Sequence, residues 1–236
     1  MKRILVTGSS RGLGLEFVKQ YLEKGNLVIA SSRNPHKSSA LKKLKNKYSE
    51  NLMIIKLDVS KREEREKAFD IISKQFHALD LLINNAGIIS GDEKNPSVLG
   101  EIYKEDFSKV LLVNSISPLL MSEKFLPLLE KGKNVKIVNI TSMNGSIAKR
   151  TVGGKYSYAT SKAALNMITK IMSNDLREKG ITTLAIHPGW IKTDMGGEEA
   201  PLEKEEPISM IIDLVEKSDL SHSGKFLDWQ GNEVPW

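Results

Sequence analysis

Residues 3–14 read Arg-Ile-Leu-Val-Thr-Gly-Ser-Ser-Arg-Gly-Leu-Gly, a short apolar run followed by glycines at positions 8, 12 and 14. Such a run predicts a strand buried on both faces. The glycines permit a tight turn, let backbone N–H groups approach a pyrophosphate, and let the next helix pack against the strand. The stretch therefore predicts a strand, a phosphate-binding turn and a helix, as in a dinucleotide-binding βαβ unit, rather than a turn with three glycines by chance.

The same alternation of apolar runs and helical stretches continues through the chain. Strands are expected at residues 3–7, 27–30, 52–57, 79–83, 135–140 and 182–186, and helices at residues 12–24, 35–48, 62–76, 114–130 and 158–179. Alternating strands and helices form parallel sheets through right-handed crossovers. The sequence therefore predicts an α/β fold, a doubly wound parallel sheet with helices on both faces. No linker or repeat divides the chain, so we expect one domain over residues 1–236.

The composition excludes several kinds of chemistry. The 236 residues contain no cysteine, which excludes disulfides, thiolate metal sites and a cysteine nucleophile, and favours a reducing compartment. The four histidines form no His-x-x-x-His or His-x-His pair, so no metal site is expected. The apolar run after Met1 is too short for a signal peptide, and no stretch approaches about 18 apolar residues. We expect a soluble, cytoplasmic protein without a membrane partner.

Positive charge is concentrated at the beginning of the chain. The net charge is +6, and the first 50 residues hold 11 Lys or Arg against 3 Asp or Glu. A basic segment suits nucleic acid, a membrane surface or a phosphorylated small ligand. The lysines at positions 42, 43, 45 and 47 follow a helical pattern and are expected to cover a solvated surface. No recognition helix or aromatic RNA-binding motif accompanies them, so we expect no nucleic-acid partner.

The end of the second predicted strand indicates which dinucleotide binds. An acidic residue there would bind the ribose hydroxyls of NAD, but the sequence has Ser32 and Arg33, which suit the 2′-phosphate of NADP. Arg11 in the glycine turn offers a second cation. NADP(H) is therefore favoured over NAD(H); the alternative is that Arg33 only ends a strand and Arg11 is solvated. Asp58, before Val59, is a candidate acceptor for the adenine amino group, or a helix N-terminal signal.

Tyr158 and Lys162 are the candidate proton-transfer pair. Four residues apart on a helix, they share one face, so the ammonium is expected to favour the phenolate and lower the pKa of the tyrosine. The alternative is an exposed aromatic beside a solvated cation. Ser142 ends the preceding strand close to the beginning of that helix, although Thr141 and Ser146 offer hydroxyls too. Tyr156 competes as the acid, but the residue four positions later is an uncharged threonine.

These motifs resemble those of the classical short-chain dehydrogenase/reductase family over nearly the whole chain. The resemblance is carried, in order and spacing, by Thr7-x-x-x-Gly-x-Gly14, Asn84-Asn85-Ala86-Gly87, Asn114, Ser142 and Tyr158-x-x-x-Lys162. Residues 153–158, 187–197 and 224–236 are similar to the C-factor and sniffer-type carbonyl reductase branch. The resemblance implies a Rossmann fold of about seven strands in the order 3-2-1-4-5-6-7.

The resemblance also implies a role for each matching position. Tyr158 would protonate a carbonyl oxygen, or deprotonate an alcohol in reverse, while Lys162 would lower its pKa and hold the nicotinamide ribose. Ser142 would donate to the substrate oxygen, and Asn114 would hold a water for proton resupply. The implied cofactor-binding residues are Gly8, Ser10, Arg11, Gly12, Leu13, Gly14, Ser32, Arg33, Asp58, Val59, Asn85, Ala86, Gly87, Tyr158, Lys162, Pro188, Gly189, Ile191 and Thr193.

The expected activity is NADPH-dependent reduction of a small carbonyl, or oxidation of the corresponding alcohol. The alternative is a C-factor-like signalling or scaffold protein that keeps the dinucleotide-binding fold. Ser142 lies 16 residues before Tyr158 rather than about a dozen, as in many relatives, which is expected to alter the rim of the substrate pocket. Residues 195–207 have hinge-capable glycines and are expected to form a substrate lid. Relatives include homodimers, homotetramers and monomers, and the sequence leaves that choice open.

Overall fold

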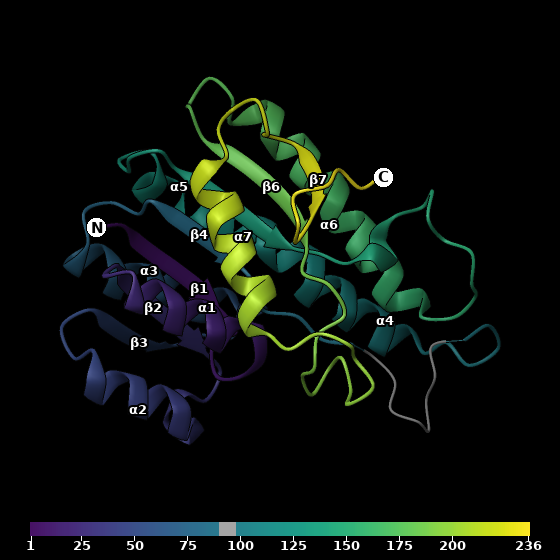
Figure 1. The fold of residues 1–236 in the computed structure, drawn as a ribbon, viewed down its shortest axis with the longest axis horizontal. Coiled ribbons are helices and arrows are strands. Elements are labelled where there is room, and N and C mark those ends of the chain that lie inside the picture. Colours follow the sequence, from purple (N-terminus) through teal and green to yellow (C-terminus); the bar gives the residue numbers. More distant parts are fainter. Residues whose placement is uncertain (90–97) are drawn as a thin grey trace.

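One parallel sheet of seven strands organises the chain. The computed structural model describes residues 1–89 and 98–236. The strands are β1 (Arg3–Thr7), β2 (Leu27–Ser32), β3 (Leu52–Lys56), β4 (Leu81–Asn84), β5 (Lys136–Ile140), β6 (Thr182–His187) and β7 (Lys225–Asp228). They lie in the order β3-β2-β1-β4-β5-β6-β7 (Figure 1). The predicted doubly wound α/β fold and its strand order are confirmed.

Helices connect successive strands. They are α1 (Gly12–Glu23), α2 (Ser39–Lys47), α3 (Arg62–Gln75), α4 (Lys104–Leu111), α5 (Ser117–Leu129), α6 (Tyr156–Asp175) and α7 (Glu205–Lys217). Three short segments accompany them: the 3₁₀ turns η1 (Pro35–Lys37) and η3 (Met143–Gly145), and a π-helical turn, η2 (Leu112–Ile116), between α4 and α5. The chain moves outward from β1 to β3 and returns to β4 beside β1. That reversal creates the crevice in which doubly wound sheets bind ligands.

Each face of the sheet has its own apolar core. Alternate side chains of β1 divide between them, so that Ile4 and Val6 pack on one face and Leu5 on the other. The first core includes residues of α1, α2 and α7, and the second includes residues of α3, α5 and α6 (Figure 1). Because both faces are covered, the strands are continuous apolar runs, as the sequence indicated.

Several element boundaries differ from the expectation. The helix expected at residues 35–48 is interrupted at Ser38, whose Oγ accepts from the backbone N–H of Leu41 and so caps α2. The helix expected from residue 114 begins ten residues earlier, because α4, η2 and α5 follow one another directly. The strand at residues 225–228 and helix α7 had not been located in the sequence. Glu205 to Pro207, expected in the lid, lie in the first turn of α7.

A buried carboxylate anchors the end of the sheet opposite the glycine turn. Asp80 accepts from the Arg3 backbone N–H at 2.8 Å, from Arg3 Nε at 2.9 Å and Nη2 at 2.8 Å, and from the Lys133 backbone N–H at 2.8 Å. Its side chain is 4% exposed. Burial opposes its ionisation, but these hydrogen bonds outweigh burial and hold the pKa of Asp80 below its usual value. The contact ties β1 to the beginnings of β4 and β5.

Within residues 1–89 and 98–236, no helix is both long and apolar enough to cross a membrane.

Candidate active site

The glycine turn between β1 and α1 needs glycine for two different reasons. Gly8 and Gly12 have φ angles of +69° and +55°, a region that other residues seldom adopt. At Gly14 the constraint is space: a Cβ there would lie 2.3 Å from the Gly8 carbonyl oxygen and 2.5 Å from Asn85 Nδ2. Glycine therefore lets this turn pack closely at the N-terminus of α1, with Ser10 in the turn and Leu13 as the second residue of the helix.

Residues that follow β4 hold the turn in place. Asn85 Nδ2 donates to the carbonyls of Thr7 and Gly8, at 2.9 Å and 3.2 Å. Thr7 Oγ1 accepts from the backbone N–H groups of Asn85 and Ala86, both at 3.0 Å. The side chain of Asn85 is therefore occupied with the glycine turn. Ala86 packs against it as well, since a Cβ on Gly8 would lie 2.8 Å from the Ala86 Cα.

The ends of β2 and β3 carry polar groups at the same edge of the sheet. Ser32 Oγ is buried and has no hydrogen-bond partner among the described residues, while Arg33 is exposed beside it. Asp58 Oδ1 accepts from Ser60 N at 3.0 Å and Ser60 Oγ at 2.6 Å. Burial opposes ionisation of Asp58, yet these hydrogen bonds hold its pKa below the usual value. Val59, next in the chain, is buried.

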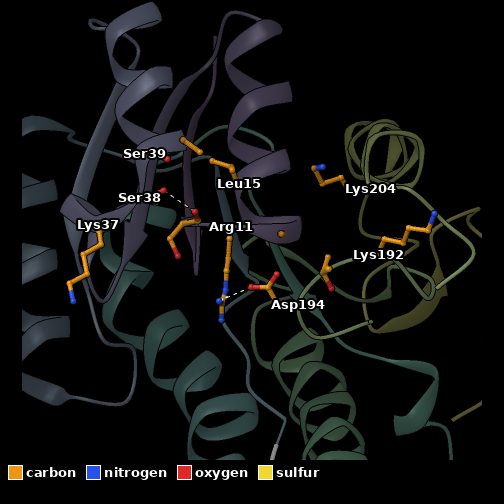
Figure 2. A pocket seen from close by; sticks show the side chains of 12 residues that line it. Arg11, Leu15, Lys37, Ser38, Ser39, Lys192, Asp194 and Lys204 are labelled. Atoms are coloured by element: carbon orange, nitrogen blue, oxygen red, sulfur yellow. Dashed lines mark hydrogen bonds and ion pairs between the residues drawn. The ribbon is translucent and has the colours of Figure 1, made fainter. Parts of the chain in front are cut away.

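A cleft of about 430 Å³ adjoins the glycine turn (Figure 2). It lies between the beginnings of α1 and α2 and the segment after β6, and its lining includes Lys37, Lys192 and Lys204. Arg11 Nη1 contacts Asp194 Oδ2 at 2.6 Å across this space, and both side chains are largely exposed (Figure 2). Lys37 was not singled out in the sequence. Its place four residues after Arg33, in the turn before α2, was the available signal.

Ser142 and Tyr158 meet where β5 and α6 approach each other. Ser142 is the second residue after β5, and Tyr158 lies in the first turn of α6. Burial raises the pKa of Tyr158 above its usual value, and a hydrogen bond with Ser142 lowers it by less. The alternatives are used elsewhere: Thr141 Oγ1 donates to Asn166 Oδ1 at 2.8 Å, and Ser146 Oγ donates to the carbonyl of Pro235.

Lys162 is a buried cation beneath Tyr158. Its side chain is 5% exposed, and its Nζ donates to the carbonyl of Ile140 at 2.8 Å and lies 5.7 Å from the centre of the Tyr158 ring. Burial lowers the pKa of Lys162 to about 8. The sequence predicted that the lysine lowers the pKa of Tyr158; in the structure the desolvation of the phenol outweighs any such effect, and that expectation is corrected.

Asn114 connects this cluster to the segment after β4. It lies in the π-helical turn η2, where its Oδ1 accepts from Ile88 N at 2.8 Å and its Nδ2 donates to Ile88 O at 2.8 Å and Ser161 Oγ at 3.0 Å. A Cβ on Gly87 would lie 3.4 Å from Asn114 Oδ1 and 3.8 Å from Lys162 Nζ. π-Helical turns occur frequently at functional sites, and this one places Asn114 beside Gly87 and Lys162.

The segment after β6 closes the arrangement. Pro188 and Gly189 follow β6 directly, and Gly189 has a φ of +95° and packs closely against Leu202 and Trp229. Ile191 is buried and pairs with Leu202. Thr193 Oγ1 accepts from the Gly196 backbone N–H at 3.0 Å, and a Cβ on Gly12 would lie 3.5 Å from the Thr193 methyl. The structure thus brings this segment against the glycine turn.

All the predicted site residues lie at or beside the carboxyl edge of the sheet. They form two groups: the glycine turn with the ends of β2, β3 and β4, and the cluster of Asn114, Ser142, Tyr158 and Lys162. Gly87 and Thr193 lie where the groups meet. This edge joins a glycine turn at a helix N-terminus to a phenol, a hydroxyl and a buried ammonium, which are groups that can bind an anion and transfer a proton.

Comparison with known proteins agrees with this geometry. The sequence pattern of the family described as short chain dehydrogenase matches residues 2–204. The chain belongs to the short chain dehydrogenase family. Members of this family are oxidoreductases that use a nicotinamide cofactor, and the resemblance found in the sequence is confirmed.

Individual members of the short chain dehydrogenase family cover this chain extensively. C-signal from Myxococcus xanthus is 41% identical over 158 residues, which are 67% of this chain and 93% of that protein. The solved structure of NADPH-bound carbonyl reductase from chicken fatty liver is 35% identical, with a TM-score of 0.92 over 100% of this chain and 99% of that one. Carbonyl reductase Sniffer of D. melanogaster is 32% identical, with a TM-score of 0.93 over 100% of both chains.

Proposed function

We propose that the chain is an NADPH-dependent carbonyl reductase that acts on a small aldehyde, ketone or quinone, or on the corresponding alcohol in reverse. The observation that supports this most directly is the meeting of Ser142, Tyr158 and Lys162 at one point of the edge where dinucleotides bind in this fold. The three groups are a hydroxyl donor, a phenol and a buried ammonium, which are the parts of a carbonyl-reducing site.

Tyr158 is the proposed general acid. Burial raises its pKa, so the phenol is protonated at neutral pH, the state that an acid must have before it gives its proton to a carbonyl oxygen. Ser142 donates a second hydrogen bond to the same oxygen and fixes its distance from the phenol. Bound NADPH supplies the hydride for the carbonyl carbon.

Lys162 and Asn114 act after Tyr158 has given up its proton: they stabilise the phenolate and restore the proton. The ammonium of Lys162, 5.7 Å from the ring centre, stabilises the phenolate by its charge, and it also holds the nicotinamide ribose. Asn114 holds a water that resupplies the proton through Lys162. In this scheme the lysine acts on the product of proton transfer more than on the resting pKa of the phenol.

The residues present suit NADPH rather than NADH. The glycine turn packs so closely on itself and on residues 85 and 86 that side chains at Gly8 and Gly14 would displace it, and such a turn at the N-terminus of α1 suits a pyrophosphate. Ser32 Oγ, which has no partner in the part of the chain that the structure describes, and the exposed Arg33 suit a 2′-phosphate. Lys37 offers a further cation, and Arg11 can exchange Asp194 for phosphate. Solved relatives described as NADPH- or NADP-bound add support. The other proposed contacts with the cofactor are Asp58 with the adenine amino group, Val59 beside it, residues 85–87 along the cofactor after β4, and Pro188, Gly189, Ile191 and Thr193 with the carboxamide.

The proposed lid is shorter than the sequence suggested. Since α7 begins at Glu205, we assign this role to residues 195–204. Trp190 Nε1 donates to the Gly196 carbonyl at 2.7 Å, and Gly196 lies against Ile191, so the segment begins from a fixed point beside the cofactor-binding residues. Closure of such a segment over the substrate would exclude water.

The test is to follow NADPH oxidation with a panel of aldehydes, ketones and quinones. Tyr158→Phe should lower turnover at least a hundredfold while NADPH binding is kept, because only the proton donor is lost. Tyr156→Phe is the matched control, since Tyr156 is exposed two residues earlier and should retain turnover. Equal rates for the parent and Tyr158→Phe would contradict the assignment.

The second candidate is a signalling or scaffold protein that keeps the dinucleotide site. The likeness to the protein named C-signal favours it. Tight NADPH binding without turnover of any member of the panel would support this alternative. The complete set of Asn114, Ser142, Tyr158 and Lys162 argues against it, because binding alone does not need these four groups together.

A further inference from the structure

One side chain contacts both ends of the loop between β5 and α6. Arg150 is partly buried in the irregular part of this loop. Its Nη1 donates to Asn144 Oδ1 at 2.8 Å, and its Nη2 donates to the carbonyls of Gly153, at 3.0 Å, and Gly154. A single guanidinium therefore joins the turn after β5 to the residues immediately before the helix of Tyr158.

Asn144 donates two hydrogen bonds to the hydroxyl oxygen of Ser142. The Asn144 backbone N–H lies 3.2 Å from Ser142 Oγ, and Asn144 Nδ2 lies 3.3 Å from it, both as donors. A hydroxyl group has one proton and two lone pairs. Because both lone pairs receive an N–H group, the hydroxyl proton of Ser142 is left to donate. Its partner is Tyr158, whose pKa the hydrogen bond with Ser142 lowers, as a donor to the phenol oxygen would.

Arg150 determines which end of the Asn144 amide faces Ser142. A guanidinium has donors and no acceptor, so the atom of Asn144 that faces it must be the oxygen. The NH₂ group must then face Ser142. A rotated amide would place its oxygen against Ser142. That oxygen would accept a hydrogen bond from the Ser142 hydroxyl, which would then no longer donate to Tyr158.

We propose that Arg150 and Asn144 are a positioning pair that keeps the Ser142 hydroxyl as a donor toward Tyr158 and the substrate oxygen. This inference rests on the proposed function, because it assigns Ser142 the role of donor in that reaction. Neither residue touches the reacting atoms; both act through Ser142. Loss of the pair should lower kcat about 10- to 100-fold, as expected when a group that orients a catalytic residue is removed.

Asn144→Asp is the decisive variant. The new carboxylate still pairs with Arg150 and holds the loop. It offers no NH₂ group to Ser142, however, and accepts a hydrogen bond from the Ser142 hydroxyl instead. We expect kcat to fall at least tenfold, with the KM for NADPH and the melting temperature unchanged. The pKa of Tyr158 should rise further, because the hydrogen bond that lowers it is lost.

Substitutions of Arg150 separate amide orientation from loop packing. Arg150→Lys keeps a side chain that only donates, whereas Arg150→Gln can donate or accept and lets the amide rotate. Arg150→Lys should therefore retain clearly more kcat than Arg150→Gln. The matched control is Arg177→Gln, because Arg177 donates to a backbone carbonyl, that of Leu220, away from the site. It should leave kcat unchanged.

The outcomes distinguish this inference from the proposed function. Parental kcat in Asn144→Asp, or equal kcat in Arg150→Lys and Arg150→Gln, would overturn the positioning pair while leaving carbonyl reduction intact. If the parent turns over no substrate, the proposed function fails. The pKa of Tyr158 then tests whether Arg150 and Asn144 orient the Ser142 hydroxyl. NMR titration of ring-labelled tyrosine, assigned with Tyr158→Phe, would show an upward shift in Asn144→Asp if the pair acts as described, and no shift if it does not.

Discussion

The amide nitrogen of Asn85 lies where a side chain on Gly14 would begin, 2.5 Å from the position of its Cβ. The two residues are 71 positions apart in the sequence, yet they share one volume at the carboxyl edge of the sheet. Asn85 uses that place to hold the carbonyls of Thr7 and Gly8.

Gly14→Ala should therefore disturb the glycine turn. The methyl group would also lie 2.3 Å from the Gly8 carbonyl oxygen, so the turn must move. We expect a loss of about 1–3 kcal/mol in the free energy of unfolding and a large loss of NADPH affinity. Urea unfolding and fluorescence titration with NADPH measure the two effects. Gly153→Ala is the control, because a Cβ there meets nothing within 4 Å; an equal effect of both variants would contradict the explanation.

Arg33→Ala tests the choice of cofactor. Loss of a charge-assisted hydrogen bond to a phosphate costs about 1.5–3 kcal/mol, so the Kd for NADPH should rise about 10- to 100-fold while that for NADH stays the same. Arg62→Ala removes another exposed arginine and should change neither Kd. Isothermal titration with both cofactors gives the answer, and the same loss for NADH as for NADPH would contradict a 2′-phosphate contact.

The lowered pKa of Lys162 predicts a pH dependence near neutrality. With a pKa of about 8, the ammonium is charged below that pH and loses its proton above it. The phenolate of Tyr158 is then no longer stabilised, so kcat/KM for carbonyl reduction should fall as the pH rises through about 8. A pH profile with a substrate that does not titrate measures this. The residual kcat/KM of Lys162→Arg should not fall as the pH rises through about 8. A constant kcat/KM in the parent up to about pH 9.5 would contradict the role of Lys162 as the titrating group.

Asp80 should be a major contributor to stability. Asp80→Ala leaves the half-buried guanidinium of Arg3 and two backbone N–H groups without their acceptor, at a cost of about 3 kcal/mol. The pKa of Asp80 is lowered in the folded state, so its contribution is complete above the unfolded pKa of about 4 and is lost as the pH falls further. Urea unfolding at neutral and acidic pH measures both effects. Asp213→Ala breaks an exposed ion pair with Lys24 and should cost about 0.5 kcal/mol or less.

Burial of His187 should lower the stability of the fold in mildly acidic solution, at a higher pH than the loss caused by protonation of Asp80. Burial lowers its pKa to about 4, while nearby Asp228 opposes this, and its Nδ1 has no partner among the described residues. The unfolded chain, with a histidine pKa of about 6.5, binds the proton more readily, so stability falls as the pH decreases from about 6.5 to 4. His187→Gln should reduce that loss by about 2 kcal/mol at about pH 5, measured by urea unfolding. The same pH dependence in parent and variant would contradict the prediction.

The fold was predictable because its signals are local and repeated. Short apolar runs such as residues 3–7, each followed by a helical pattern, lead to one kind of sheet. The seventh strand was not located, because Lys225–Asp228 is short and lies at the edge of the sheet. Helix α4 was not located either, since its apolar positions occupy little of its eight residues.

The candidate site was predictable as a set of residue types but not as a set of contacts. The spacing of Tyr158 and Lys162 indicated one helical face, and that is where they lie. The direction of the tyrosine pKa was wrong, because desolvation depends on what surrounds the phenol and not on the residue four positions away. Contacts between distant segments, such as Asn85 with Gly8 or Arg11 with Asp194, leave no periodic signal in the sequence. The roles of these residues and the oligomeric state stay predictions.

The π-helical turn at Leu112–Ile116 makes the length of the chain there as important as its composition. An α-helix turns by about 100° per residue, so deletion of one residue that restored regular α-helical spacing would rotate everything on one side by that angle. Either Asn114 would leave Ile88, or α5 would carry Phe125 out of the core. Natural relatives should therefore vary freely in identity at exposed positions of this turn while keeping its residue count.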